Sequence, residues 1–304
     1  MPVRPRCLVY LVAGAALFGG AACTPDHSAE SRRIKASAVS VDPAQPLTDR
    51  EKDVLHEAEQ LLIRACMSER GFRTWVVPRM PLPEDRDFPY VVDDVRWAGE
   101  HGYGSELQKR RDQVRSSDPN RRYFERLSPE EQQLALDALH GRSSARQLKV
   151  TAPNGMTVAR FADGCTARAQ EELYGDLRAW FRASTITDTL GDMDRAKVFT
   201  EKEFKDSARD WSACMSGRGF PYMTPHDSRR AFRKPADTTS RQKEIRTAVA
   251  EAECAVSSGL SATAHRLEQR NGAHLTDEYT DEFRNRLRLE RAALKRARST
   301  VENG

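Results

Sequence analysis

The cysteines are the residues of this chain whose type and spacing most directly predict chemistry. The chain has six cysteines, and Cys66 and Cys214 lie in two nearly identical segments, residues 65–72 and 213–220, which match at seven of eight positions. Such an internal repeat indicates two versions of one structural unit. No Cys-x-x-Cys motif occurs, so structural disulfides are expected here and a redox or metal-thiolate site is not.

Four of these cysteines allow three disulfide connectivities. The repeat favours the one in which each Cys-Met helix is bonded to the later Cys helix of its own unit, which gives Cys66–Cys165 and Cys214–Cys254. The other two connectivities stay open from sequence alone. No metal site, cofactor or catalytic residue is predicted: the histidines are scattered singly, and residues 56–60 place Gln where the zinc-protease helix motif needs its second His.

Most of the repeated segment is explained as a helix stop. Gly71 follows a predicted helix, where glycine accepts a positive φ without steric cost. Phe72 is then expected to fold back onto Met67. The second copy repeats this arrangement with Met215, Gly219 and Phe220.

Local signals also place helix starts and buried faces. Residues 48–51 and 200–203 both fit the capping box, and Phe199 with Phe204 fits a hydrophobic staple at the second start. Helical spacing predicts one stripe that runs through Cys165, Ala169, Leu173, Leu177 and Trp180. The helix of Cys254 is expected to bury the stripe of Ile245, Val249, Ala252, Val256 and Leu260.

These signals predict a mainly α fold with long irregular loops. The repeat divides the body into two related disulfide-braced helical units, residues 47–190 and residues 191–304. A small β-hairpin is expected near residues 148–160, because a Pro-Asn-Gly turn lies at its centre. The chain has 49 basic and 45 acidic side chains. This near balance does not indicate a nucleic-acid-binding face.

The amino terminus predicts export and a membrane anchor. Residues 1–22 read as a signal peptide, with arginines before a short apolar run and small residues at its end. Gly19–Cys23 resembles the lipobox of bacterial lipoproteins, although Gly20 replaces the usual Leu. Cys23 is therefore expected to carry lipid such as palmitate, which leaves an even number of cysteines for disulfides. Ordinary cleavage after Ala22 is the alternative. Residues 23–46 are polar and proline-containing, as in a disordered tether.

The stretch between the first repeat and residue 104 is rich in aromatic rings and proline. Two interpretations are open: the rings cover the exposed side of a helical pair, or they line a groove for an apolar, glycan or peptide ligand. A loop of this length is uncommon without a function. The candidate groove residues are Trp75, Phe88, Tyr90, Trp97 and Tyr103.

The arrangement resembles a group of uncharacterised actinobacterial secreted proteins and lipoproteins with Cys-Met-x-x-x-Gly-aromatic motifs. The resemblance rests on Cys66–Phe72, Phe88–Tyr90, Trp97, Gly102–Gly104, Cys165, Cys214–Phe220 and Cys254. It implies a location in the cell envelope and no established activity. We therefore expect a lipid-anchored binding module on the extracellular face of the cell membrane, or otherwise a secreted one, whose partner is an envelope protein or cell-wall component. A cell-envelope hydrolase and a transporter-accessory solute-binding lipoprotein are the alternatives.

The lipid anchor predicts the chemical state of the mature amino terminus. Mass spectrometry of the membrane fraction should find the chain beginning at Cys23 with acyl chains attached. The Cys23→Ala variant should move from the membrane fraction to the medium, because the chain then lacks its anchor. An unmodified, freely secreted amino terminus at residue 23 would contradict the prediction.

Overall fold

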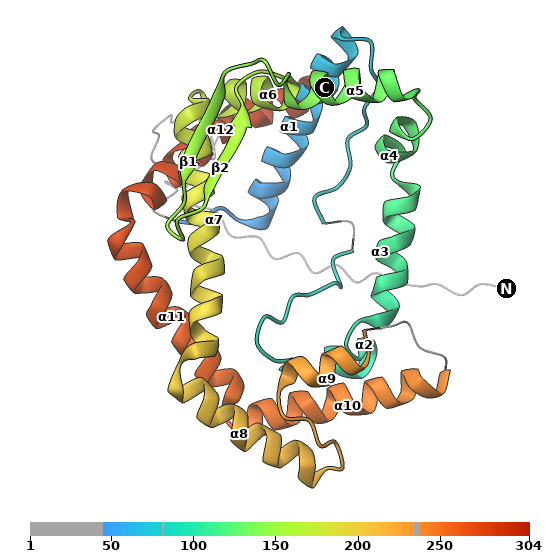
Figure 1. The fold of residues 1–304 in the computed structure, drawn as a ribbon, viewed down its shortest axis with the longest axis vertical. Helices are drawn as coiled ribbons and strands as arrows, with labels where there is room; N and C mark the ends of the chain where they lie inside the picture. Colours follow the sequence, from blue (N-terminus) through green and yellow to red (C-terminus); the bar gives the residue numbers. More distant parts are fainter. Residues whose placement is uncertain (1–44, 81, 234–237) are drawn as a thin grey trace, which may run out of the picture. The chain divides into compact units, whose positions relative to one another are not determined.

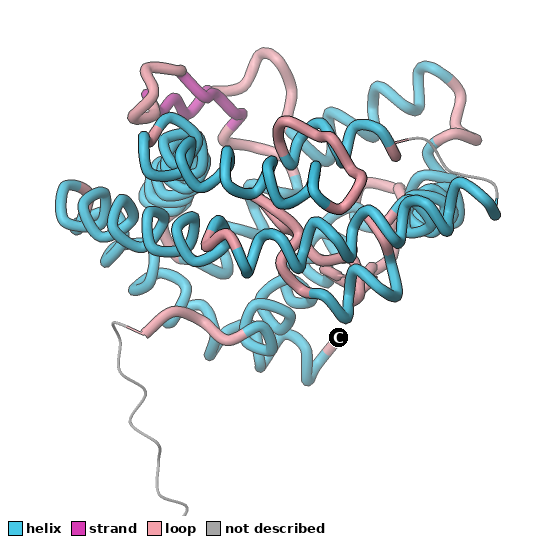
Figure 2. The backbone as a smooth tube through the Cα atoms, turned by 90° about the horizontal axis from the view of Figure 1, so that it is seen from below, coloured by secondary structure: helices cyan, strands magenta, loops and turns pink. Residues whose placement is uncertain are grey.

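The computed structural model describes residues 45–80, 82–233 and 238–304. Over these ranges the chain is mainly helical, with twelve helices and one two-stranded antiparallel sheet (Figures 1 and 2). The predicted signal peptide, and the predicted tether except for residues 45 and 46, lie outside the described ranges. None of the helices found there is long and apolar enough to span a membrane.

The helices and strands follow one another along the chain with short connections, apart from the long segment between the first two helices. Their bounds are α1 Asp49–Glu69, α2 Val95–His101, α3 Ser105–Ser117, α4 Pro119–Phe124, α5 Pro129–His140, β1 Gln147–Thr151, β2 Thr157–Phe161, α6 Cys165–Tyr174, α7 Leu177–Thr200, α8 Lys202–Gly217, α9 Pro225–Ala231, α10 Thr238–Ser257, α11 Leu260–Glu278 and α12 Thr280–Asn303. The strands pair in the predicted hairpin.

The last helix returns to the first. The apolar face of α12, with Leu289 and Leu294, packs against Leu55 of α1 and Leu173 of α6 (Figure 1). The unit boundary predicted after residue 190 falls inside α7, which continues without a break to Thr200. All described residues belong to one compact body. The repeat therefore marks two similar helix pairs that share one folded body, because α12 buries its apolar face on the other half of the chain.

One disulfide joins the two helices within each pair, with the connectivity that the repeat favoured. Cys66–Cys165 joins α1 to α6, with 5.6 Å between the Cα atoms. Cys214–Cys254 joins α8 to α10, with 5.8 Å between the Cα atoms. Both distances lie in the ordinary range for a disulfide.

The helix stops predicted from the repeat are confirmed. Gly71 has a φ of +84°, and the Phe72 amide donates to the Met67 carbonyl at 2.9 Å. Gly219 has a φ of +85°, and the Phe220 amide donates to the Met215 carbonyl at 2.9 Å. This is the six-residue bond of a Schellman motif. The two copies therefore share one local structure because they share one sequence.

Three local predictions were wrong. Thr200 does not cap α8, because it still belongs to α7 and its hydroxyl donates to the Lys197 carbonyl. The stripe from Cys165 to Trp180 is not one helix, because Gly175 adopts a left-handed conformation and ends α6. Val256, placed on a buried stripe, is 62% exposed.

The disulfide that closes the longer loop should contribute slightly more to stability, because the contribution rises with the logarithm of loop length. The sequence separations are 99 residues for Cys66–Cys165 and 40 residues for Cys214–Cys254. In the chain-entropy model, removal by double Cys→Ala substitution lowers the free energy of unfolding by about 5 and about 4 kcal/mol respectively. Urea denaturation of each double variant measures this. Four free thiols in the native protein would contradict the pairing.

Candidate functional site

The segment between α1 and α2 crosses the body and enters the core beside α10. Four residues of its end are buried: Phe88, Tyr90, Val91 and Val92 are each less than 10% exposed. Val91 and Tyr90 pack among α8, α10 and α11, whereas Phe88 and Val92 pack against α2 and α10. A segment without regular structure needs polar partners for its backbone when it is buried. α10 supplies them.

Glu251 of α10 is the centre of this polar contact. Its side chain is fully buried and accepts hydrogen bonds from the Val92 amide at 3.0 Å and from the Tyr103 hydroxyl at 2.6 Å. The Ser228 hydroxyl of α9 also donates to it, and Arg229 Nε lies 3.8 Å away. Burial raises the pKa of Glu251, while Arg229 and these donors favour the charged form. One carboxylate thus joins three segments.

Glu244 repeats this role two helical turns earlier on α10. Its carboxylate accepts from the backbone amides of Tyr103 at 2.9 Å and Ser105 at 3.2 Å, and from the Ser105 hydroxyl. Arg241 lies 3.2 Å from it. The chain approaches so closely that a Cβ on Gly102 would lie 2.9 Å from both Arg241 and Glu244. Glycine is required there for space as well as for its φ of +61°.

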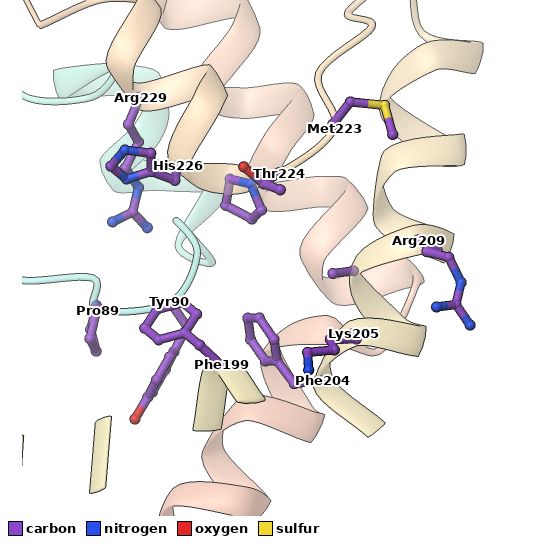
Figure 3. Close-up of a pocket in the computed structure, with 12 residues that line it drawn as sticks. Pro89, Tyr90, Phe199, Phe204, Lys205, Arg209, Met223, Thr224, His226 and Arg229 are labelled. Carbon is purple, nitrogen blue, oxygen red and sulfur yellow. The ribbon is translucent and has the colours of Figure 1, made fainter. Parts of the chain in front are cut away.

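A cavity of about 640 Å³ opens where this anchored segment meets α8 and α9 (Figure 3). The Tyr90 ring lies 5.5 Å from Phe199 and 6.2 Å from Phe204, and the two phenylalanine rings lie 5.2 Å apart at a steep angle. The contact predicted as a staple between Phe199 and Phe204 is therefore present. We call this space the Tyr90 cavity. Its lining is Pro89, Tyr90, Phe199, Phe204, Lys205, Ala208, Arg209, Met223, Thr224, Pro225, His226 and Arg229.

The lining of the Tyr90 cavity is apolar with a cationic edge. Lys205 and Arg209 come from α8, and His226 and Arg229 come from α9. The lining residues include no carboxylate. The Arg229 guanidinium donates to the Phe88 carbonyl, which fixes it beside the entering segment. Its Nε and Nη2 atoms are buried without a hydrogen-bond partner in the described part of the chain.

The structure does not bring the five predicted groove residues together. Trp75 lies edge-on to Tyr123 at 5.7 Å, away from α10. Phe88 and Trp97 contact each other at 4.7 Å, and Tyr103 packs against the same buried group. Of the five predicted groove residues, only Tyr90 lines the Tyr90 cavity. Phe88, Trp97 and Tyr103 instead line a separate cavity of about 330 Å³. The residues that complete the Tyr90 cavity come from α7, α8, α9 and the segment before α9.

Sequence reasoning missed the two buried glutamates. Glu244, Thr247 and Glu251 share one face of α10 with Ala248 and Ala252, and all five side chains are buried. The apolar pattern pointed elsewhere on the helix because it counted only hydrophobic residues. Acidic residues spaced seven apart among alanines were the available signal. That spacing returns to the same helix face after two turns.

A serine, a histidine and an aspartate also meet near this site. Asp93 accepts hydrogen bonds from the Ser261 hydroxyl at 2.5 Å and from His265 Nε2 at 3.1 Å. In a serine hydrolase the histidine stands between the serine and the carboxylate. Here the carboxylate stands between the other two, so His265 is not placed to take the serine proton. Within the described ranges, no group of three or more His, Cys, Asp or Glu side chains forms a metal site.

The Tyr103–Glu251 contact should contribute measurably to stability. Tyr103→Phe removes one donor from a buried carboxylate, so the free energy of unfolding should fall by about 1.5–3 kcal/mol. Tyr123→Phe is the matched control, because that ring packs on Trp75 and not on Glu251. Urea denaturation compares the variants. Equal losses in both would contradict the role of Glu251.

Comparisons with known proteins found no relative of this chain. No protein-family model, no curated protein and no solved structure matches the chain. The resemblance to actinobacterial secreted proteins stays a prediction. The Tyr90 cavity is accordingly interpreted from its own geometry.

Proposed function

We propose that this protein is an extracytoplasmic binding module of the cell envelope, held at the extracellular face of the cell membrane by lipid on Cys23. Its ligand is an apolar envelope component that enters the Tyr90 cavity. The observation that carries the proposal is the cavity itself. At about 640 Å³ it has the size of ordinary small-molecule sites, and it has the apolar lining that such sites have.

The exposed apolar side chains at the cavity support a binding role. Phe199 is 45% exposed and Met223 is 75% exposed, although both are large and apolar. Such groups gain free energy when a ligand covers them. Methionine also adapts its shape to different apolar partners because its side chain is unbranched and flexible.

The walls of the cavity are held in place before any ligand arrives. Tyr90 is placed by the segment that Glu251 and Arg229 hold at Val92 and Phe88. Phe204 is buried in the core formed with Trp211 and Met215 of the same helix. A site that is already ordered loses less entropy on binding. This favours recognition of a defined ligand.

The attachment of the tether is compatible with an open cavity. Arg291 of α12 donates to the carbonyls of Gln45 at 2.7 Å and Pro46 at 3.2 Å, so the described chain begins beside α12. The Tyr90 cavity is built by α8, α9 and the ends of neighbouring segments. The start of the described chain and the Tyr90 cavity thus lie on different helices.

The cavity should bind a neutral apolar probe, N-phenyl-1-naphthylamine, with an increase in its fluorescence. Phe199→Ala should weaken the affinity about tenfold, because the lost ring contact is worth roughly 1.4 kcal/mol. Leu134→Ala on α5 is the matched control, since Leu134 is an exposed apolar side chain outside the cavity. Binding that is absent, or that Phe199→Ala leaves unchanged, would overturn the assignment of the site.

A further inference from the structure

We propose that the Tyr90 cavity selects a free amphiphilic anion: an apolar ring or chain lies among the aromatic side chains, and a carboxylate-like head group lies at the cationic edge. This rests on the proposed binding function and adds the chemical class of the ligand.

The charge at the Tyr90 cavity is of one sign, which distinguishes it from other cavities of the described chain. Its lining includes four side chains that are cationic or become so on protonation, and no carboxylate. A cavity of about 330 Å³ beside Phe88 is lined by both Asp85 and Arg86. A cavity of about 580 Å³ beside α1 is lined by both Asp49 and Arg79. Acidic and basic residues are nearly equal in number along the chain, so a one-sign lining is a specific feature of this site.

The cations of the cavity are incompletely paired. Lys205 is exposed and forms no ion pair with any carboxylate of the described ranges. Arg229 approaches Glu251 only to 3.8 Å and keeps two buried nitrogens without partners among the described atoms. Arg209 is paired with Asp206 at 2.6 Å, but its side chain is largely exposed. An anionic group would therefore find the exposed Lys205 ammonium free of an ion pair among the described residues, without disturbing the buried contact between Arg229 and Glu251.

These two incompletely paired cations come from different helices, with the apolar wall between them. Lys205 follows Phe204 on α8, and Arg229 lies on α9 next to His226 (Figure 3). Tyr90, Phe199 and Phe204 contact one another at tilted or edge-on angles, so together they form a continuous apolar wall. A ligand that is both apolar and anionic matches the two parts of the lining at once.

A pair of fluorescent probes tests the charge preference directly. 8-Anilinonaphthalene-1-sulfonate has the same ring system as N-phenyl-1-naphthylamine and carries an added sulfonate. The full-length protein should bind the sulfonate at one saturable site about tenfold more tightly, and added salt should reduce this difference. Lys205→Glu should weaken binding of the sulfonate at least tenfold more than it weakens binding of the neutral probe.

Lys202→Glu is the matched control variant. It makes the same charge change on the same helix, but Lys202 does not line the cavity, so neither probe should respond. Thermal melting followed by circular dichroism confirms that both variants are folded. If Lys205→Glu leaves the sulfonate affinity unchanged while the neutral probe still responds to Phe199→Ala, the anion proposal fails and the binding function stands. If neither probe binds, both fail.

Displacement distinguishes a free amphiphile from a membrane head group. Decanoate should displace the sulfonate probe, and decanol should do so at least tenfold more weakly because it lacks the charge. Vesicles of phosphatidylglycerol should leave the probe bound, since their acyl chains stay in the bilayer. Displacement by the vesicles and not by decanoate would overturn the proposal of a free ligand.

Discussion

The buried carboxylate of Glu251 is the contact on which the rest of the site depends. A long segment without regular structure crosses from α1 to α2 and enters the core, where its backbone has no helix or sheet partners of its own. Glu251 supplies an acceptor at Val92 and joins that segment to Tyr103, to Ser228 and to Arg229. A buried charge is costly unless several donors surround it. Here the same donors that stabilise the carboxylate also fix the wall of the cavity.

The disulfides and the carboxylate act on different parts of the body. Each disulfide joins a helix that carries the repeated Cys-Met segment to a later helix of the chain. The segments that follow the repeated helix stops differ in length and course: the first is long and crosses to α10, and the second leads directly to α9. The repeated part therefore gives the body its braced helices. The part that is not repeated gives it a cavity.

The Tyr90 cavity brings together elements that are far apart along the chain. Tyr90 comes from the long segment, Phe199 from the end of α7, Phe204 and Lys205 from α8, and Arg229 from α9. Because α7 ends and α8 begins within two residues of each other, Phe199 and Phe204 face the same space. The proposed function uses this convergence: an apolar wall from one set of side chains and a cationic edge from another. Neither the apolar wall nor the cationic edge would by itself distinguish this site from ordinary protein surface.

The sequence by itself determined the features that depend on a few neighbouring residues. The helix stops at Gly71 and Gly219, the hairpin and the even set of paired cysteines all follow from local backbone geometry or from the repeat. Only the tertiary structure decided that Tyr90 lines the Tyr90 cavity whereas Trp97 does not, and that α10 buries Glu251. The Val92–Glu251 contact joins residues 159 positions apart. No local pattern specifies such a contact, because it forms only when packing has placed both segments and removed water from between them.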